Sequence, residues 1–122
     1  MARILVVDDE IEIRHLLRQM LEREGYEVSE APDGEVAVRL FRADPFDLVI
    51  TDIIMPEKEG IKTIFELRHD YPNVKIIAIS GGSRVEPQAY LDTAEAFGAV
   101  RSFVKPFSTL EMIQTVRELL SA

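Results

Sequence analysis

The sequence has no cysteine, a deficit of basic residues and no long apolar run, and each shortage excludes a class of protein. Without cysteine, the 122 residues cannot form a disulfide framework, a thiolate metal site or a cysteine nucleophile. The 14 basic residues against 22 acidic ones give a net charge of −8, which argues against binding to a nucleic-acid backbone or an anionic membrane. No apolar stretch approaches the roughly 20 residues that cross a bilayer. The first residues do not have the pattern of a signal peptide, so we expect a soluble cytoplasmic protein.

Apolar runs of strand length alternate with amphipathic stretches along the chain. The runs at 4–7, 26–31, 46–51, 74–79 and 100–104 predict five strands, and the last is the least apolar, which favours an edge. On the first predicted helix, five apolar side chains recur on one face: Ile13, Leu16, Leu17, Met20 and Leu21. The alternation predicts an α/β fold, a (βα)5 doubly wound parallel sheet with helices on both faces. The last helix ends almost at Ala122, so we expect one domain over residues 1–122 and no output domain.

Three short signals mark the ends of the later helices. Pro87 is a favoured first-turn residue and predicts the start of a fourth helix, which Gly98 is expected to end. The side chains expected to face inward from this helix are Tyr90, Leu91, Ala94 and Phe97. The run from Ser108 to Glu111 has the capping-box pattern and predicts the start of the last helix.

Polar side chains stand at the carboxyl ends of four predicted strands. The run Asp8-Asp9-Glu10 follows the first strand and Asp52 ends the third, while Ser80 and Lys105 end the fourth and fifth. In parallel sheets these ends share one edge, where ligands bind. Clustered carboxylates need a counter-ion, and Mg²⁺ prefers oxygen ligands together with a phosphoryl oxygen. Taken alone, an acid after a strand is also typical of a helix N-cap, Ser80 of a turn, and Lys105 of a solvated surface side chain. Their coincidence predicts phosphoryl transfer to or from an aspartate, with Lys105 neutralising phosphoryl charge.

At these residues the chain resembles the receiver domain of two-component response regulators, in particular single-domain regulators of the chemotaxis kind. The matching segments, in order, are Ile-Leu-Val-Val-Asp8-Asp9-Glu, Asp52-Ile-Ile-Met55-Pro56 with Gly60, Ile-Ser80-Gly, and Lys105-Pro106-Phe107. Together they cover about residues 3 to 121. The resemblance implies a flavodoxin-like fold with strand order 2-1-3-4-5 and a cis bond between Lys105 and Pro106.

The resemblance also implies a role for each site residue. Asp52 would be the phospho-acceptor, and Ser80 and Lys105 would contact the phosphoryl group. Four groups would hold Mg²⁺, the only implied cofactor: the side chains of Asp9 and Asp52, the backbone carbonyl of Ile54 and, through a water, Asp8. One position departs from the family. Receivers usually carry an aromatic residue three positions before the lysine, where this chain has Ser102. Phe103 follows it and is expected on the opposite face of the strand.

The predicted function is that of a phosphorylated switch in a two-component phosphorelay. A sensor histidine kinase or a histidine phosphotransfer protein would supply the phosphoryl group, and a downstream protein target would read the changed surface. The surface of the fourth helix, fifth strand and fifth helix is the candidate site of a homodimer. No direct nucleic-acid or membrane partner is expected. The chain would not be an enzyme beyond self-phosphorylation from phosphodonors and autodephosphorylation.

Two alternatives stay open at this point. One is a Mg²⁺-dependent phosphatase with an aspartyl nucleophile, similar to haloacid-dehalogenase-like enzymes. Those enzymes usually carry a second acid two residues after the nucleophile, where this chain has Ile54. The other is a pseudo-receiver that binds partners without phosphorylation. The complete set of predicted site residues argues against it.

Overall fold

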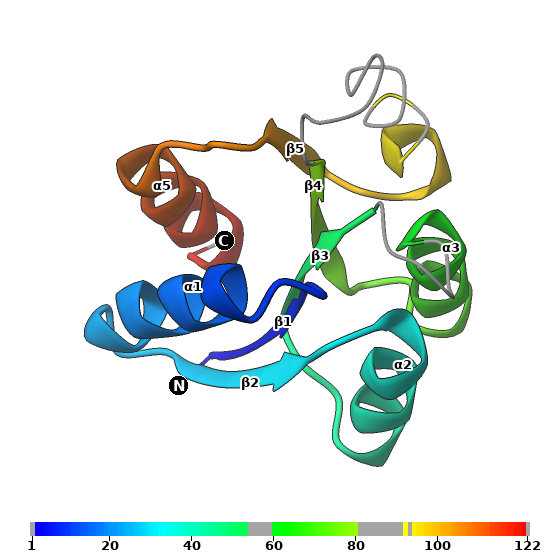
Figure 1. Ribbon diagram of the computed structural model, residues 1–122. Coiled ribbons are helices and arrows are strands. Elements are labelled where there is room, and N and C mark those ends of the chain that lie inside the picture. The colour runs from blue at the N-terminus through cyan, green and yellow to red at the C-terminus, as the bar shows by residue number, and fades with distance from the viewer. Residues whose placement is uncertain (1, 54–59, 81–91, 93, 122) are drawn as a thin grey trace.

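Five parallel strands form one sheet in the order β2-β1-β3-β4-β5 (Figure 1). The computed structural model describes residues 2–53, 60–80, 92 and 94–121. The strands are β1 (Arg3–Val7), β2 (Glu27–Ala31), β3 (Leu48–Asp52), β4 (Lys75–Ser80) and β5 (Arg101–Val104). The helices are α1 (Ile11–Arg23), α2 (Gly34–Ala43), α3 (Gly60–Asp70) and α5 (Thr109–Leu120), and residues 94–97 are helical as well. The predicted fold class and strand order are therefore confirmed.

Helices cover both faces of the sheet, with α1 and α5 on one side and α2 and α3 on the other (Figure 1). The alternation within β1 explains how one strand serves both layers. Leu5 and Val7 lie in the core on the α2–α3 side, while Ile4 and Val6 lie in the core on the α1–α5 side. The central strand β3 is buried along its whole length, whereas β5 lies at an edge of the sheet, as its weaker apolarity predicts.

Glycines end two helices in the same way. The amide of Gly25 donates to Glu22 and that of Tyr26 to Leu21, while Gly25 has a φ of 94°. At the second site, Gly98 has a φ of 134°, its amide donates to Glu95, and the amide of Ala99 donates to Ala94. Both are Schellman motifs, in which a left-handed residue ends the helix. The predicted end at Gly98 is confirmed.

The backbone approaches α3 closely at Gly98. A Cβ there would lie 2.6 Å from Cγ of Arg68, so any larger residue would both strain the backbone and collide with α3. The start of the last helix is also as predicted, because Ser108 Oγ accepts a hydrogen bond of 3.2 Å from the amide of Glu111. The Lys105–Pro106 peptide bond is cis, as the resemblance implies.

Two side chains expected in the core are exposed. Leu16 is at the border of the apolar face of α1, and the neighbouring Leu17 fills the buried position. Ala94 is buried as predicted, but Phe97 is not, and its ring meets that of Phe65 edge-on at 6.0 Å between centroids. Pro87, Tyr90 and Leu91 are outside the described residues. None of the helices among the described residues is long and apolar enough to cross a bilayer.

Candidate acidic functional site

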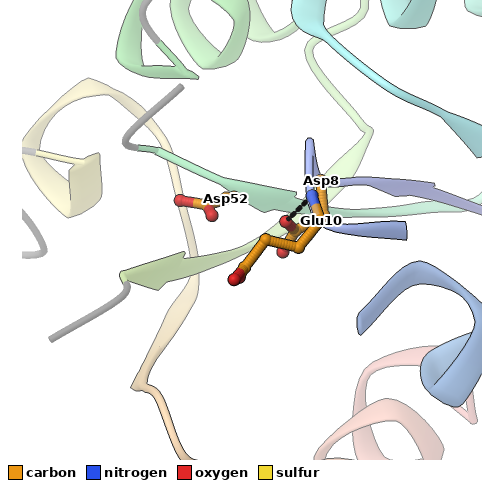
Figure 2. A group of neighbouring side chains, drawn as sticks. All are labelled: Asp8, Glu10 and Asp52. Carbon is orange, nitrogen blue, oxygen red and sulfur yellow. Dashed lines mark hydrogen bonds between the residues drawn. The ribbon is translucent and has the colours of Figure 1, made fainter. Parts of the chain in front are cut away.

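Three carboxylates meet at the carboxyl ends of β1 and β3 (Figure 2). These strands are neighbours, and Val7 pairs with Thr51 in register. Asp8 and Asp52 come next in each strand and therefore emerge side by side. One oxygen each from Asp8, Glu10 and Asp52 lies within 4.8 Å of the others. Asp8 and Asp52 are buried, and only Glu10 reaches the solvent.

A tight turn returns Glu10 over Asp8. The backbone amide of Glu10 donates a 2.8 Å hydrogen bond to Asp8 Oδ1, which is the turn that a short acidic side chain forms with its own backbone. Glu10 is the N-cap of α1, but its side chain does not cap the helix. It is directed to the site instead. Asp9 lies between the two, is exposed, and is not one of the three clustered acids.

One ammonium group faces all three acids. Lys105 Nζ lies 2.6 Å from Glu10 Oε1, 2.9 Å from Asp8 Oδ2 and 3.0 Å from Asp52 Oδ2. The backbone of Lys105 is fixed at the edge of the sheet, because its amide donates a 2.8 Å hydrogen bond to the carbonyl of Ser80 at the end of β4. Within this group, one cation therefore faces three anions.

The pKa values reflect burial first and this shortage of positive charge second. Burial raises the pKa of Asp8 to about 6, the charge of Asp52 adds to the rise, and the amide of Glu10 and Lys105 oppose it. Burial alone would lower the pKa of Lys105, but its contacts with Glu10, Asp8 and Asp52 outweigh burial and raise it. Lys105 thus stays an ammonium, and Asp8 is ionised at neutral pH only at a cost. A hard divalent cation suits such a set of oxygen donors.

Two buried oxygens at this edge are incompletely satisfied. Ser80 is fully buried, and its hydroxyl has no hydrogen-bond partner among the described residues. Asp8 Oδ2 forms the ion pair with Lys105 but lacks the alignment of a hydrogen bond. Ser80 follows Ile79, which pairs in register with Asp52. Because a buried unpaired polar atom costs free energy, a ligand that supplies partners here would be favoured.

The structure assembles most of the predicted site. It brings Asp8, Asp52 and Lys105 together and places Ser80 at the same edge of the sheet. Ile54 is outside the described residues. Glu10 was not assigned a role from the sequence. The available signal was its position in the acidic run that follows the first strand.

The departure at Ser102 also has a structural counterpart. Ser102 Oγ donates a 2.7 Å hydrogen bond to Glu95 Oε2, beside the helical residues 94–97. Phe103 packs on the other face of β5, in the α1–α5 core and against Phe107. The expectation that these two side chains face opposite sides is confirmed.

A five-stranded parallel sheet of this order, with paired buried acids and a lysine at its carboxyl edge, defines the receiver class of signalling domain. The chain belongs to this family, because the model of the response regulator receiver domain matches residues 4–117.

Known proteins of the family are similar over nearly the whole chain. The transcriptional regulatory protein CpxR of Escherichia coli is 37% identical over 120 residues, which are 98% of this chain and 50% of CpxR. The response regulator TrrA of Thermotoga maritima, solved in complex with Mg²⁺-BeF, has a TM-score of 0.86 and 38% identity, covering 98% of this chain and 100% of TrrA. The chemotaxis protein CheY4 of Vibrio cholerae has a TM-score of 0.86 at 30% identity, covering 98% and 99%. The chain spans about half the length of the curated relatives it matches.

The predicted function is confirmed at the level of the family. The chain is a receiver domain, a switch of two-component signalling, and its acidic pocket fits the phospho-acceptor site of response regulators. The phosphatase and pseudo-receiver alternatives are not favoured.

Proposed function

We propose that this chain accepts a phosphoryl group on Asp52 from a histidine kinase or a histidine phosphotransfer protein. The observation that carries the proposal is the buried Asp52 carboxylate at the end of the central strand, 3.0 Å from the ammonium of Lys105. The carboxylate therefore lies beside a cation that can stabilise its negative charge, and that of the phosphoryl oxygens, during the reaction. Ser80 is the second candidate partner of the phosphoryl oxygens, since its buried hydroxyl has no partner among the described residues.

The proposed step is an in-line transfer. A carboxylate oxygen of Asp52 attacks the phosphorus of a phosphohistidine, and the new P–O bond forms as the P–N bond breaks. The leaving imidazole nitrogen keeps the electron pair of the P–N bond, and it takes up a proton from solvent where the ring does not already carry one. Lys105 would turn from the carboxylates to a phosphoryl oxygen, and Ser80 would donate a hydrogen bond to another.

The oxygen donors of the site fit Mg²⁺. We propose that Asp9, Asp52 and the carbonyl of Ile54 bind it directly and Asp8 binds it through water, as the family resemblance implies. The structure adds Glu10, whose carboxylate lies with those of Asp8 and Asp52. When bound, Mg²⁺ supplies the positive charge that three carboxylates and a phosphoryl group lack.

The consequence of phosphorylation would be a changed protein-interaction surface. The downstream protein target, and a homodimer through residues 94–97, β5 and α5, are proposals. CpxR is a transcriptional regulator that is twice as long as the region it shares with this chain. For this chain, the single-domain organisation, the absence of direct nucleic-acid or membrane contacts and the cytoplasmic location stay predictions.

Intact mass after incubation with a small-molecule phosphodonor and Mg²⁺ tests the acceptor. Wild type should gain one phosphoryl mass and Asp52→Asn should not. Asp44→Asn is the matched control, because Asp44 is an exposed acid at the end of α2, and it should be labelled like wild type. Labelling of Asp52→Asn as efficient as that of wild type would overturn the assignment. Steady turnover of small phosphate esters would instead support the phosphatase alternative.

A further inference from the structure

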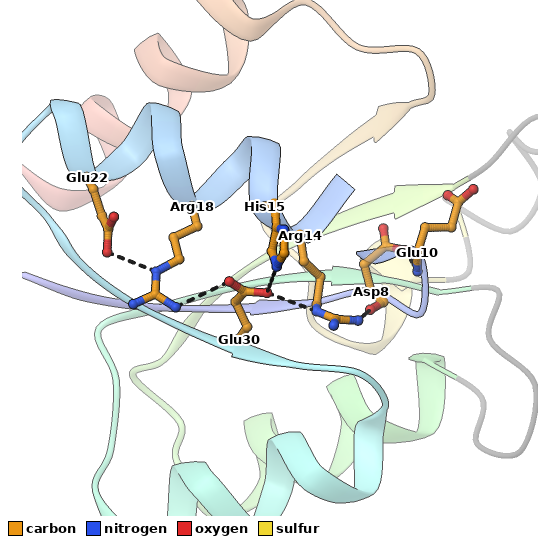
Figure 3. Close-up of polar contacts among 7 residues, drawn as sticks. All are labelled: Asp8, Glu10, Arg14, His15, Arg18, Glu22 and Glu30. Carbon is orange, nitrogen blue, oxygen red and sulfur yellow. Dashed lines mark hydrogen bonds and ion pairs between the residues drawn. The ribbon is translucent and has the colours of Figure 1, made fainter. Parts of the chain in front are cut away.

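The backbone of Asp8 is held from two sides. Its amide donates a 3.2 Å hydrogen bond to the carbonyl of Ala31 at the end of β2. Its carbonyl accepts a 2.8 Å hydrogen bond from Nη1 of Arg14, which reaches back from the first turn of α1 (Figure 3). The residue that opens the acidic loop is thereby fixed to both β2 and α1.

Arg14 is itself anchored by Glu30 of β2. Arg14 Nε donates a 3.1 Å hydrogen bond to Glu30 Oε1, and the two side chains are only 14% and 15% exposed. The other oxygen of Glu30 lies 3.3 Å from Arg18 Nη1, and Arg18 pairs with Glu22 at 2.9 Å (Figure 3). The planar guanidinium therefore bridges a strand side chain and a loop carbonyl in one fixed geometry.

We propose that Arg14 is a positioning residue for the acidic site. By fixing the carbonyl of Asp8, it would set the direction of the Asp8 carboxylate and the turn that brings Glu10 back to the site. Arg14 would act through the backbone carbonyl of Asp8. Among the described residues, its guanidinium contacts Glu30 and that carbonyl, and not the carboxylates of Asp8, Glu10 or Asp52. The inference rests on the proposed Mg²⁺ site.

The sign of one measurement separates positioning from charge. Arg14 is a cation near a cation site, so its removal should tighten Mg²⁺ binding if only Coulomb repulsion counts. If Arg14 positions the ligands, its removal should weaken binding despite the relief of repulsion. Loss of a partner that orients a metal ligand typically lowers metal affinity on the order of tenfold or more.

The test is the Mg²⁺ affinity of the whole chain by titration calorimetry, for wild type, Arg14→Gln and Arg18→Gln. Arg18 is the matched control, because it belongs to the same helix and also pairs with Glu30 but donates to no group of Asp8. We expect Arg14→Gln to bind Mg²⁺ about tenfold more weakly. Arg18→Gln should bind like wild type or slightly more tightly.

Two further variants keep the test sharp if Arg14→Gln folds poorly. Arg14→Lys keeps the charge but replaces the rigid planar guanidinium by a flexible ammonium that does not fix the geometry between Glu30 and the Asp8 carbonyl, so its affinity should fall between those of wild type and Arg14→Gln. Glu30→Gln leaves Arg14 in place with a weaker anchor and should lose less affinity than Arg14→Gln. Unfolding temperatures in a chelator measure stability separately from binding.

An NMR signal adds a readout that a loss of stability alone would not move. In metal-free protein, the amide of Glu10 donates to Asp8 Oδ1, so its ¹H–¹⁵N resonance should shift in Arg14→Gln and not in Arg18→Gln. The inference about Arg14 would be overturned, and the proposed Mg²⁺ site left standing, if Arg14→Gln bound Mg²⁺ as tightly as wild type or if both arginine variants lost equal affinity. Failure of wild type to bind Mg²⁺ would overturn the proposed metal site and the inference with it.

Discussion

The pKa values of two carboxylates on neighbouring strands are shifted in opposite directions. Asp8 follows β1 and Glu30 lies in the adjacent β2, where Val6 is its partner in register. Burial raises the pKa of Asp8 to about 6. Burial also opposes ionisation of Glu30, but hydrogen bonds from Arg14 and Arg18 outweigh it and lower its pKa. The two sites differ in burial and in the supply of cations. Asp8 is completely buried and shares one lysine with two other acids, whereas the Glu30 side chain is 15% exposed and lies beside two arginines and His15.

This contrast separates a structural region from a binding region. The charged groups of the α1–β2 network pair with one another, so this network does not need a ligand from outside the chain. The acidic edge leaves carboxylates short of positive charge and a buried serine hydroxyl without a partner among the described residues. Buried groups with raised pKa values and incomplete partners gather at functional sites, where the ligand completes them. Four predictions test the contrast, from the largest expected effect to the smallest.

The largest effect concerns Asp8. We expect Asp8→Asn to raise the free energy of unfolding of the metal-free protein by about 1–3 kcal/mol near neutral pH, because it removes a buried anion whose ionisation is unfavourable. Asparagine keeps an oxygen for the amide of Glu10, and Lys105 keeps Glu10 and Asp52. Urea unfolding in a chelator measures the difference. A loss of stability in Asp8→Asn would show that the negative charge of Asp8 is compensated in the folded protein as well as that of Glu30.

The pH dependence of this difference has a definite sign. The pKa of Asp8 in the folded state is about 6, above its ordinary value of 3.8, so the folded state binds the proton more tightly. Wild type is therefore favoured below the ordinary value and loses that stability as the pH rises toward 6. The advantage of Asp8→Asn should be absent in acid and complete above the folded-state pKa.

The second effect is stabilisation by Mg²⁺. At a Mg²⁺ concentration tenfold above the dissociation constant, wild type should gain about 1.4 kcal/mol of unfolding free energy. At that concentration Asp8→Asn should gain less, because it has lost one oxygen anion of the site. Parallel urea titrations with Mg²⁺ and with chelator measure both gains. Equal gains would mean that the ion binds elsewhere.

The third effect reverses the sign of the first. Glu30→Gln should lower the free energy of unfolding by about 1 kcal/mol near neutral pH, because Arg14 and Arg18 lose their shared anion. The pKa of Glu30 is lowered below the ordinary 4.5, so its contribution is present above that value and is lost as the pH falls through the folded-state pKa. Urea unfolding across this range should show the two proteins converge in acid. A persistent difference would point to packing rather than charge.

The sequence predicts the frame of this contrast better than its details. The parallel sheet and the position of Asp8, Asp52, Ser80 and Lys105 at one edge follow from apolar runs and their polar ends, because parallel strands must end at one edge. The strand order follows only from the family resemblance. The role of Arg14 does not follow, since it depends on how α1 packs against β2, and along the sequence Arg14 is only a polar residue between apolar ones. Periodicity also misplaced Phe97, which is exposed and meets the exposed ring of Phe65 edge-on, whereas Ala94 of the same predicted face is buried.

The smallest effect on stability is expected at Glu10, the exposed member of the acidic group. Its side chain is 60% exposed, and Lys105 keeps its contacts with Asp8 and Asp52 without it, so Glu10→Gln should change the free energy of unfolding by less than about 0.5 kcal/mol.

The effect of Glu10→Gln on binding should be larger than its effect on folding. One of three clustered carboxylates loses its charge, so Mg²⁺ affinity should fall severalfold. Glu12→Gln is the control, because Glu12 is an exposed acid in the first turn of α1 and is not a member of the cluster. Calorimetric titration of both variants separates a local contribution from net charge. If the two lose equal affinity, Glu10 acts only through the overall charge of the chain, and the acidic site at this edge consists of Asp8, Asp52 and their remaining partners.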